Sequence, residues 1–294
     1  MNYYNEIKQE LINNEITKRV KDYSKNRSDL NTYYNVGKML SEAGKHYGEG
    51  IIKEYSNRLT MELGKGYGVS NLKRMRQFYL LIEKGATLSH QITWSHYYEI
   101  ISLNDIYKIN YYIEIIEKYN LSIRQLRVRI KNNEYERLPE ETKNRIISKT
   151  ESSVIDYVKN PILIKNKYNT NDISEKVLQQ LILEDIESFM NELGNSFCFI
   201  SSEYKIKLGN RYNYIDLLLF NIEYNCYVVI ELKVTELKKE YIGQIQVYMN
   251  YIDNNLKRIT NDKTIGIIIC KRNNRYIIEY CSDNRIISRE YNLI

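Results

Sequence analysis

Residues 214–220 read Tyr-Ile-Asp-Leu-Leu-Leu-Phe, and residues 227–233 read Tyr-Val-Val-Ile-Glu-Leu-Lys. Each run is mostly apolar and carries one acidic residue, Asp216 in the first and Glu231 in the second. Short apolar runs bounded by Asn-containing turns are typical of buried strands. A carboxylate in such a strand is costly to desolvate unless it is paired or binds a metal ion. The two runs therefore predict a sheet with a chemical function.

The spacing of these residues also predicts their geometry. The short turn around 221–225 would fold the two runs into a hairpin that brings Asp216 beside Glu231. Strand alternation puts Glu231 and Lys233 on one side, with Leu232 facing a core on the other. Two close carboxylates repel each other unless a divalent cation lies between them, and hard oxygen ligands favour Mg²⁺. A lysine beside them can hold a phosphate oxygen or orient a water molecule, as phosphodiester hydrolysis requires.

Two further polar residues follow on the next predicted helix, over 240–254. Gln244 and Tyr248 lie four residues apart and therefore share one helix face. They can orient an attacking water molecule or the backbone of DNA. The alternative for the acidic and basic residues is a lattice of ion pairs on an exposed sheet face. The apolar residues that flank them argue against it.

The C-terminal part of the chain predicts an α/β domain over 173–294. A helix is expected from Ser174 to Leu193, and Gly194 ends it. The hydrophobic period then changes, and a helix is expected among short strands. We expect these strands at 197–201, 204–208, 214–220, 226–232, 264–270 and 276–280. Residues 136–172 are polar, contain both prolines and are expected to form an irregular linker.

The N-terminal part predicts an all-α domain over 1–135. Helical spacing of apolar residues is present over 31–41, 51–63, 71–83, 96–101, 105–119 and 122–132. Residues 64–68 read Gly-Lys-Gly-Tyr-Gly and interrupt the pattern, and Ser70 is the expected N-cap of the helix that follows.

The second and third of these helices have the punctuation of a helix-turn-helix. The third offers Asn71, Lys73, Arg74 and Arg76 as DNA-binding residues, because such side chains reach phosphates or guanine edges. The alternative is a helical hairpin with a solvated basic face, and the sequence leaves both open. The adjacent Ser95 and His96 lack an evident acid partner, so we interpret His96 as a capping or packing residue.

Charge and composition limit the classes of protein to which this sequence can belong. Residues 1–150 hold 25 Lys and Arg against 18 Asp and Glu, a net of +7, which leaves −1 for the remainder of the +6 total. A basic first half suits contact with a polyanion. The four cysteines lie in apolar runs without a CxxC pair, which argues against a zinc site and predicts small core residues. The first residues lack the apolar core of a signal peptide, and we expect a cytoplasmic protein.

Several longer motifs resemble the YhcG-like family of PD-(D/E)xK nuclease-domain proteins. Besides the two strands, these are Gly-Gln-Ile-Gln-Val-Tyr-Met-Asn-Tyr (243–251), Thr-Ile-Gly-Ile-Ile-Ile-Cys (264–270), Phe-Met-Asn-Glu-Leu-Gly (189–194), Thr-Trp-Ser-His-Tyr (93–97) and Tyr-Gly-Val-Ser-Asn-Leu-Lys-Arg-Met-Arg-Gln-Phe-Tyr (67–79). The resemblance spans nearly the whole chain. It implies a restriction-endonuclease-like mixed sheet flanked by helices, with Asp216, Glu231 and Lys233 in the metal-site roles and Gln244 following.

The resemblance implies a Mg²⁺-dependent DNA endonuclease, with Mn²⁺ able to substitute, that acts on DNA as a homodimer in defence, restriction or DNA processing. The alternatives are a non-catalytic DNA-binding or accessory protein on a nuclease scaffold and a branched-DNA resolvase. Two positions depart from the family. Gln179 stands where an acidic residue is common, which leaves Glu175, one turn earlier, as the candidate third metal ligand. Ser202 and Glu203 stand where the family tends to Arg-Gln, which weakens expected phosphate contact.

Overall fold

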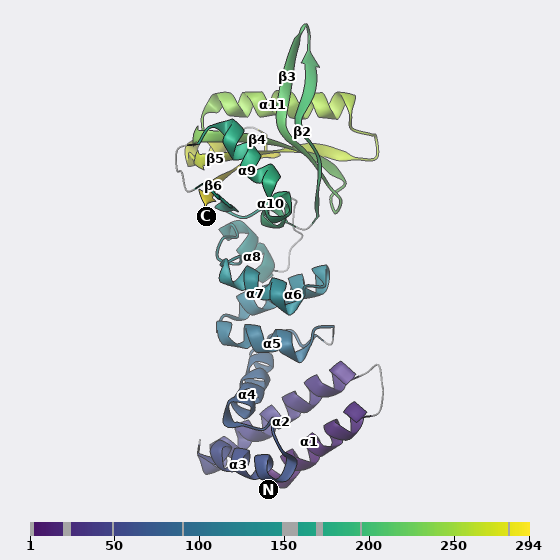
Figure 1. Ribbon diagram of the computed structural model, residues 1–294, viewed down its shortest axis with the longest axis vertical. Helices are drawn as coiled ribbons and strands as arrows, with labels where there is room; N and C mark the ends of the chain where they lie inside the picture. Colours follow the sequence, from purple (N-terminus) through teal and green to yellow (C-terminus); the bar gives the residue numbers. More distant parts are fainter. Residues whose placement is uncertain are drawn as a thin grey trace. The chain divides into compact units, whose positions relative to one another are not determined.

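The computed structural model describes residues 3–19, 25–48, 50–89, 91–148, 158–168, 173–194, 196–281 and 283–294. The chain divides into two compact units, Met1–Tyr135 and Glu136–Ile294. The first is helical and the second is a mixed sheet with helices on both faces (Figure 1). None of the described helices is both long and apolar enough to span a membrane.

The first unit is built from α-helices joined by short connections. Its elements are α1 (Tyr3–Arg19), α2 (Lys25–Tyr47), α3 (Ile51–Leu63), α4 (Val69–Glu83), α5 (Trp94–Ile100), the 3-10 helix η1 (Ile101–Leu103), α6 (Ile106–Tyr119) and α7 (Ile123–Lys131). All six predicted helical segments are present, whereas α1 was not predicted. The expected N-cap at Ser70 is wrong, because α4 begins one residue earlier and Gly68 occupies the cap position in extended conformation.

The first unit's core depends on a close approach of α2 and α4. A Cβ atom added to Gly37 would lie 2.1 Å from the backbone oxygen of Met75, so only glycine fits between the two helices. Trp94 packs beside them, with ring centroids 4.6 Å from Tyr33 and 5.4 Å from Phe78. These contacts assign the tryptophan to the core.

The second unit begins inside the segment that was expected to be an irregular linker. Its elements are α8 (Glu140–Ser148), β1 (Ile162–Ile164), α9 (Glu175–Glu184), α10 (Ile186–Leu193), β2 (Phe197–Leu208), β3 (Arg211–Asn221), β4 (Cys226–Glu236), α11 (Lys239–Asn255), β5 (Asp262–Arg272), α12 (Arg275–Glu279) and β6 (Ile286–Leu293). The linker prediction is wrong for the described part of 136–172, because α8 lies there and β1 joins the sheet. Residues 149–157 and 169–172 of that segment lie outside the described residues.

The six strands form one sheet in the order β1-β6-β5-β4-β3-β2. The strands β1, β6, β5 and β4 run parallel to their neighbours, and β3 and β2 are antiparallel. One face packs on α9 and α10 through residues such as Leu181, Phe189 and Leu232. The other packs on α11 through Ile245 and Met249. Helices therefore cover both faces, as the predicted α/β fold class requires.

Two predicted elements in this unit are wrong. Residues 276–280 were expected to be a strand, but they form most of α12, which lies in the crossover between the parallel strands β5 and β6. A five-residue apolar run fits a strand or a helix equally well. The single helix expected from Ser174 to Leu193 is broken at Asp185, whose side chain accepts a hydrogen bond from Ser188 N and caps α10. Its predicted end at Gly194 is confirmed.

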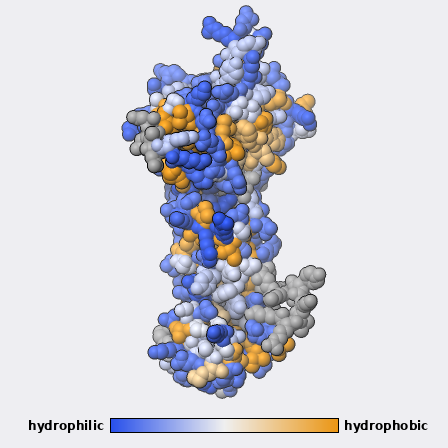
Figure 2. Space-filling view, in the orientation of Figure 1, coloured by the Kyte–Doolittle hydropathy of each residue, from blue (hydrophilic) through white to orange (hydrophobic). Residues whose placement is uncertain are grey.

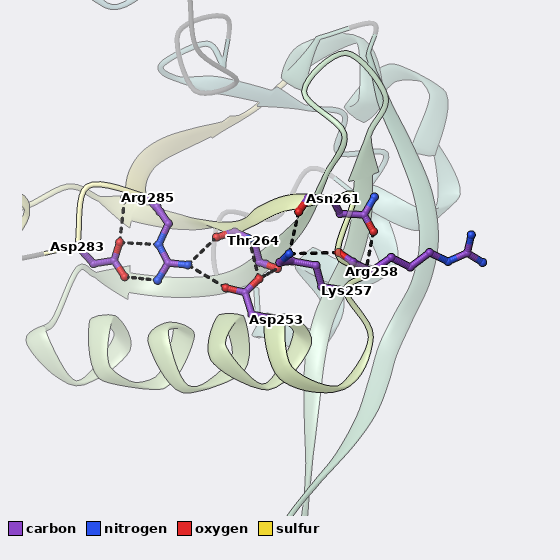
Figure 3. Close-up of polar contacts among 7 residues, drawn as sticks. All are labelled: Asp253, Lys257, Arg258, Asn261, Thr264, Asp283 and Arg285. Atoms are coloured by element: carbon purple, nitrogen blue, oxygen red, sulfur yellow. Dashed lines mark hydrogen bonds and ion pairs between the residues drawn. The ribbon is translucent and has the colours of Figure 1, made fainter.

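An ion-pair cluster fixes the end of α11 to the strands beside it (Figure 3). Arg285 donates to Asp283 through Nε at 2.9 Å and Nη2 at 2.6 Å, and through Nη1 to Asp253 of α11 at 3.1 Å. Asp253 also accepts from the backbone and hydroxyl of Thr264 on β5. These contacts join α11, β5 and the loop before β6 at the end of the sheet where β5 begins.

The expectation that all four cysteines lie in the core is wrong at Cys198. That residue is exposed on β2, at the edge of the sheet, whereas Cys226 and Cys270 are buried. Burial raises the pKa of Cys226 and of Cys270 to about 12. The two buried thiols therefore remain protonated at neutral pH and act as small apolar residues.

Candidate active site

The site lies where β3 and β4 separate. Their backbone pairing ends at Leu217 and Ile230, and the next position in the same register places Asp216 opposite Glu231. There the Oδ2 atom of Asp216 accepts a hydrogen bond from the backbone N–H of Leu232 at 2.7 Å. The carboxylate thus replaces the carbonyl that would continue the ladder, and it keeps the N–H group paired while the strands diverge.

Glu231 is the most deeply buried acid of the site, with 1% of its surface exposed. Its Oε1 atom has no hydrogen-bond partner among the described residues. Burial and the neighbouring carboxylate of Asp216 raise the pKa of Glu231 to about 8, and the adjacent Lys233 only partly offsets them. A buried oxygen without a partner costs free energy, so this atom is a natural ligand for a cation.

Lys233 links the second strand to the helix that precedes the sheet. Its Nζ atom lies 3.3 Å from Oε2 of Glu231 and 3.4 Å from Oε2 of Glu175 on α9. Burial alone would lower the pKa of this lysine, but the carboxylates of Glu231, Asp216 and Glu175 outweigh it and raise the pKa. The ammonium group therefore stays charged within the site. The predicted arrangement, with Glu231 and Lys233 on one side and Leu232 in the core, is confirmed.

The first two turns of α9 supply two groups to this region. Ser174 caps the helix by accepting from Val177 N, which places Glu175 in its first turn. Gln179 is buried, and its Nε2 atom donates to the backbone oxygen of Asp216 at 2.9 Å. The position where an acid is common in the family is thus used here to hold the strand that carries Asp216.

Gln244 and Tyr248 come from α11, as predicted, and share one face. The Nε2 atom of Gln244 donates to the hydroxyl of Tyr248 at 3.1 Å. Burial raises the pKa of Tyr248, and the negative charges of Glu231 and Asp216 add to the effect while Gln244 opposes it. The tyrosine hydroxyl is therefore protonated and within electrostatic reach of both carboxylates.

Glu203 is a site neighbour that the sequence motifs did not identify. In β2, Ser202 pairs with Leu217 and Tyr204 with Ile215, so Glu203 stands opposite Asp216 across the hairpin. Its φ of 47° is a left-handed conformation that is uncommon for a glutamate. Its charge contributes to the raised pKa of Asp216, although burial is the larger cause. The sequence gives no signal for this pairing, because the register of β2 passes through a bulge between Phe199 and Ser201.

The residue types of the site fit a divalent cation. Asp216 and Glu231 offer hard oxygen ligands, which divalent cations prefer. The buried Oε1 atom of Glu231 has no hydrogen-bond partner among the described residues, so a bound cation would satisfy it. Among the described residues, no group of three or more His, Cys, Asp or Glu side chains is arranged to hold a metal ion. The predicted third carboxylate, that of Glu175, instead contacts Lys233.

The four candidate DNA-binding residues on α4 are not gathered on one free face. Asn71 donates to Gly66 O at 2.9 Å, within the glycine-rich turn. Arg74 donates to the backbone oxygen of Tyr98 at 3.0 Å and stacks 3.7 Å above its ring. Arg76 is half-buried, and Lys73 is exposed. The contacts of Arg74 with Tyr98 show that at least this basic residue of α4 helps to build the unit.

His96 has the capping role that the sequence predicted. Its Nδ1 atom contacts the backbone N–H of Thr93 at 3.2 Å, and its Nε2 atom contacts the backbone oxygen of Leu121 at 3.0 Å. Both ring nitrogens are therefore occupied by local structure. Burial lowers the pKa of His96. These contacts leave it no part in nucleophilic catalysis with Ser95.

Comparison with known proteins adds to this geometry. The family of the YhcG PDDEXK nuclease domain matches residues 155–293, and the DUF1016 N-terminal domain matches residues 7–137. The Escherichia coli (strain K12) protein described as "Putative nuclease YhcG" is 22% identical over 309 aligned positions, which cover 89% of this chain and 82% of that protein.

Two solved structures resemble part of this chain at low similarity. They are a repair endonuclease from Pyrococcus abyssi (17% identity, TM-score 0.29) and EndoMS in a complex with double-stranded DNA (18% identity, TM-score 0.32). Each match covers 42% of this chain, and it spans 47% and 48% of those chains, respectively. The two family domains together cover nearly the whole sequence in the expected order. This chain therefore belongs to the YhcG family, with a DUF1016 domain followed by a PD-(D/E)xK nuclease domain.

Proposed function

We propose that this protein is a deoxyribonuclease that hydrolyses phosphodiester bonds with a divalent cation, Mg²⁺ or Mn²⁺, held by Asp216 and Glu231. The observation that carries the proposal is the buried carboxylate of Glu231. One of its oxygens lacks a partner in the described part of the chain, and Asp216 stands opposite it at the end of the β3–β4 pairing. Such a carboxylate is costly to bury, and a cation would offset that cost.

Each residue of the site has a separate role in this proposal. A bound divalent cation would lower the pKa of water and neutralise charge that develops on the phosphate. Lys233, held between Glu231 and Glu175, presents its ammonium group to a phosphate oxygen or to the attacking water. Tyr248 and Gln244 orient water or the DNA backbone. Glu175 fixes the position of Lys233 and is the candidate for a third carboxylate at the ion.

Membership of a nuclease-domain family supports phosphodiesters as the substrate, and we infer DNA as the nucleic acid. One site cuts one strand at a time, so cleavage of both strands in a single binding event uses two copies of the site. We therefore propose a homodimer as the working form on duplex DNA. Lys73 and the other basic residues of α4 remain candidates for a further DNA contact.

The test is a cleavage assay on linear, nicked, branched and single-stranded DNA, with Mg²⁺, with Mn²⁺ and with EDTA. We expect cleavage that requires the cation and that is lost in Asp216→Asn. The matched control is Asp262→Asn, because Asp262 is exposed at the start of β5 and is also an aspartate on a strand. Absence of cleavage of every substrate by the wild-type protein, or equal cleavage by Asp216→Asn, would overturn the proposal.

A further inference from the structure

The strands β2 and β3 continue as a two-stranded hairpin past the point where β3 leaves β4. Pairing between β3 and β4 ends at Leu217, whereas pairing between β2 and β3 continues to Leu208 and Arg211. This hairpin projects beyond the rest of the sheet (Figure 1). Its base contains Asp216, so one end of the hairpin is the candidate active site.

The two faces of the hairpin differ sharply in burial. On one face, Ile206 and Ile215 are 1% and 0% exposed and pack into the core with α11. The other face carries Lys205 and Lys207 on β2, both exposed, with Tyr214 and Tyr212 as their cross-strand partners on β3. These tyrosines are 52% and 56% exposed, which is high for large aromatic side chains.

The exposed face lies on the hairpin whose base carries Asp216. Directly paired residues of antiparallel strands point to the same side, and so do residues two apart on one strand. Tyr212 and Tyr214 therefore lie on one face of β3, and their partners Lys207 and Lys205 lie on the same face of β2. Ile215 and Leu217 pack in different cores, so the alternation changes at Asp216, and the exposed row ends two residues from this carboxylate.

The charge of this face suits a polyanion. Residues 204–215 include three basic residues and no acidic residue. The Nζ atom of Lys205 lies 3.9 Å from the ring centroid of Tyr212, so the cation and the ring are held together. The visible surface at the end of the hairpin is hydrophilic (Figure 2). Lysines on an edge strand also discourage pairing with other chains, but that role gives no reason for two exposed tyrosines beside them.

We infer that the face of the β2–β3 hairpin formed by Lys205, Lys207, Tyr212 and Tyr214 binds the nucleic-acid strand next to the cleaved phosphate, and that the substrate has unpaired bases there. This inference rests on the proposed function and deepens it. The lysines contact phosphates, and the tyrosines stack on bases that are free of a complementary strand. Aromatic side chains in a basic groove bind single-stranded nucleic acid in this way.

The experiment compares two double variants, Lys205→Ala/Lys207→Ala and Tyr212→Ala/Tyr214→Ala, in the full-length protein. The matched control is Lys263→Ala/Tyr276→Ala, because Lys263 is exposed on β5 and Tyr276 is 72% exposed on α12. The conservative variant Tyr212→Phe/Tyr214→Phe keeps the rings. Substrates are a duplex and the same duplex with a single-stranded tail at the cleavage site. Kd, KM and kcat are measured for each.

We expect the wild-type protein to prefer the tailed substrate. The tyrosine-to-alanine variant should raise Kd and KM for that substrate by about 5-fold to about 100-fold, with little effect on the duplex, and phenylalanine should restore both. The lysine variant should flatten the dependence of log Kd on log salt concentration by up to about 1.4 for a single strand. The control variant should match the wild-type protein.

The outcomes separate this inference from the proposed function. If the wild-type protein cleaves DNA and both hairpin variants keep its Kd, KM and salt dependence, the hairpin inference is overturned and the nuclease activity stands. Equal losses on duplex and tailed DNA in the tyrosine variant would contradict base stacking. If the wild-type protein cleaves nothing, the proposed function fails, and the Kd measurements still decide whether this face binds nucleic acid.

Discussion

Oδ2 of Asp216 lies 2.7 Å from the backbone nitrogen of Leu232, and this side-chain contact takes over where the β3–β4 ladder stops. The same carboxylate is the candidate metal ligand. Its second oxygen and its charge are available only because the two strands diverge at this residue. A substitution of Asp216 therefore affects two things, the hydrogen bond at the end of the β3–β4 ladder and a candidate metal ligand.

We expect Asp216→Asn to lose cleavage and keep the fold. The asparagine carbonyl still accepts from Leu232 N, and removal of one negative charge relieves repulsion with Glu231, so the melting temperature should stay level or rise. Asp216→Leu removes the acceptor, and an unpaired buried N–H should lower the free energy of unfolding by about 1–3 kcal/mol. Thermal unfolding beside the cleavage assay distinguishes these cases. A lower melting temperature of Asp216→Asn would contradict the interpretation that this side chain takes the place of a backbone carbonyl in the ladder.

Glu231→Gln should remove metal binding without harming the apo protein. A neutral amide is easier to bury than the carboxylate, so apo stability should stay level or rise. Saturating Mg²⁺ or Mn²⁺ should raise the melting temperature of the wild-type protein and leave that of the variant unchanged, because the ion binds only the native state. Differential scanning fluorimetry over a metal titration measures this, with Asp262→Asn as the control. An equal metal response in both proteins would exclude Glu231 as a ligand.

Lys233→Ala should separate stability from chemistry. Without the lysine, the carboxyl group of Glu231 loses its cation, but its pKa of about 8 lets it take up a proton at neutral pH, so the loss should stay below the about 3–5 kcal/mol of a broken buried ion pair. A divalent cation should restore most of that loss, whereas cleavage should remain low because the lysine acts on phosphate and water. Urea unfolding with and without Mg²⁺ measures the first effect. Lys239→Ala, at the start of α11, is the comparison, and wild-type cleavage by Lys233→Ala would contradict its role.

The cluster around Arg285 should give a pH-dependent contribution to stability. Hydrogen bonds from Arg285 hold the pKa of Asp283 below its usual value, so the ionised form stabilises the folded state. That contribution is present above the pKa of the unfolded chain, about 3.9, and is lost as pH falls through the lower folded pKa. Asp283→Asn should therefore lower the free energy of unfolding by about 1–3 kcal/mol at pH 7 and progressively less below pH about 4. Urea unfolding over a range of pH measures the difference in free energy of unfolding between the wild-type protein and the variant. A difference that does not change with pH would contradict ionisation of Asp283 as its cause.

Two basic residues of α4 should behave differently on substitution. Arg74→Ala removes a hydrogen bond and a ring contact to Tyr98, and it should lower the melting temperature of the first unit. Lys73→Ala removes an exposed side chain and should leave that temperature unchanged. If α4 contacts duplex DNA, Lys73→Ala should also reduce the salt dependence of binding by about 0.9. Equal changes of melting temperature in Arg74→Ala and Lys73→Ala would contradict a stabilising role for the contacts between Arg74 and Tyr98.

The centre of the site was predictable because it depends on local rules. Strand period, one short turn and the cost of a buried charge were enough to bring Asp216, Glu231 and Lys233 together. Parts that depend on long-range pairing were missed. The strand β6 carries Ser288, Arg289 and Glu290 in its middle, so it does not read as apolar, and its pairing with β5 follows from the tertiary fold.

The roles of Gln179 and Glu203 in the site also depend on contacts between distant parts of the sequence, so they could not be predicted. Gln179 could be read only as a missing acid, because its contact with the backbone of Asp216 joins residues that are far apart in sequence. Glu203 was known only as a departure from the family. Its place opposite Asp216 requires the register of β2, which passes through a bulge between Phe199 and Ser201.

The exposed thiol of Cys198 offers a spectroscopic handle that needs no engineering. Cys226 and Cys270 are buried, and their pKa values of about 12 keep them unreactive towards maleimides at neutral pH. Cys281 is partly covered, and its thiol donates to the backbone oxygen of Asp283. A dye would therefore attach first to Cys198, on the same strand as Lys205. Energy transfer from that dye to a labelled oligonucleotide would report the direction in which a DNA strand runs along β2.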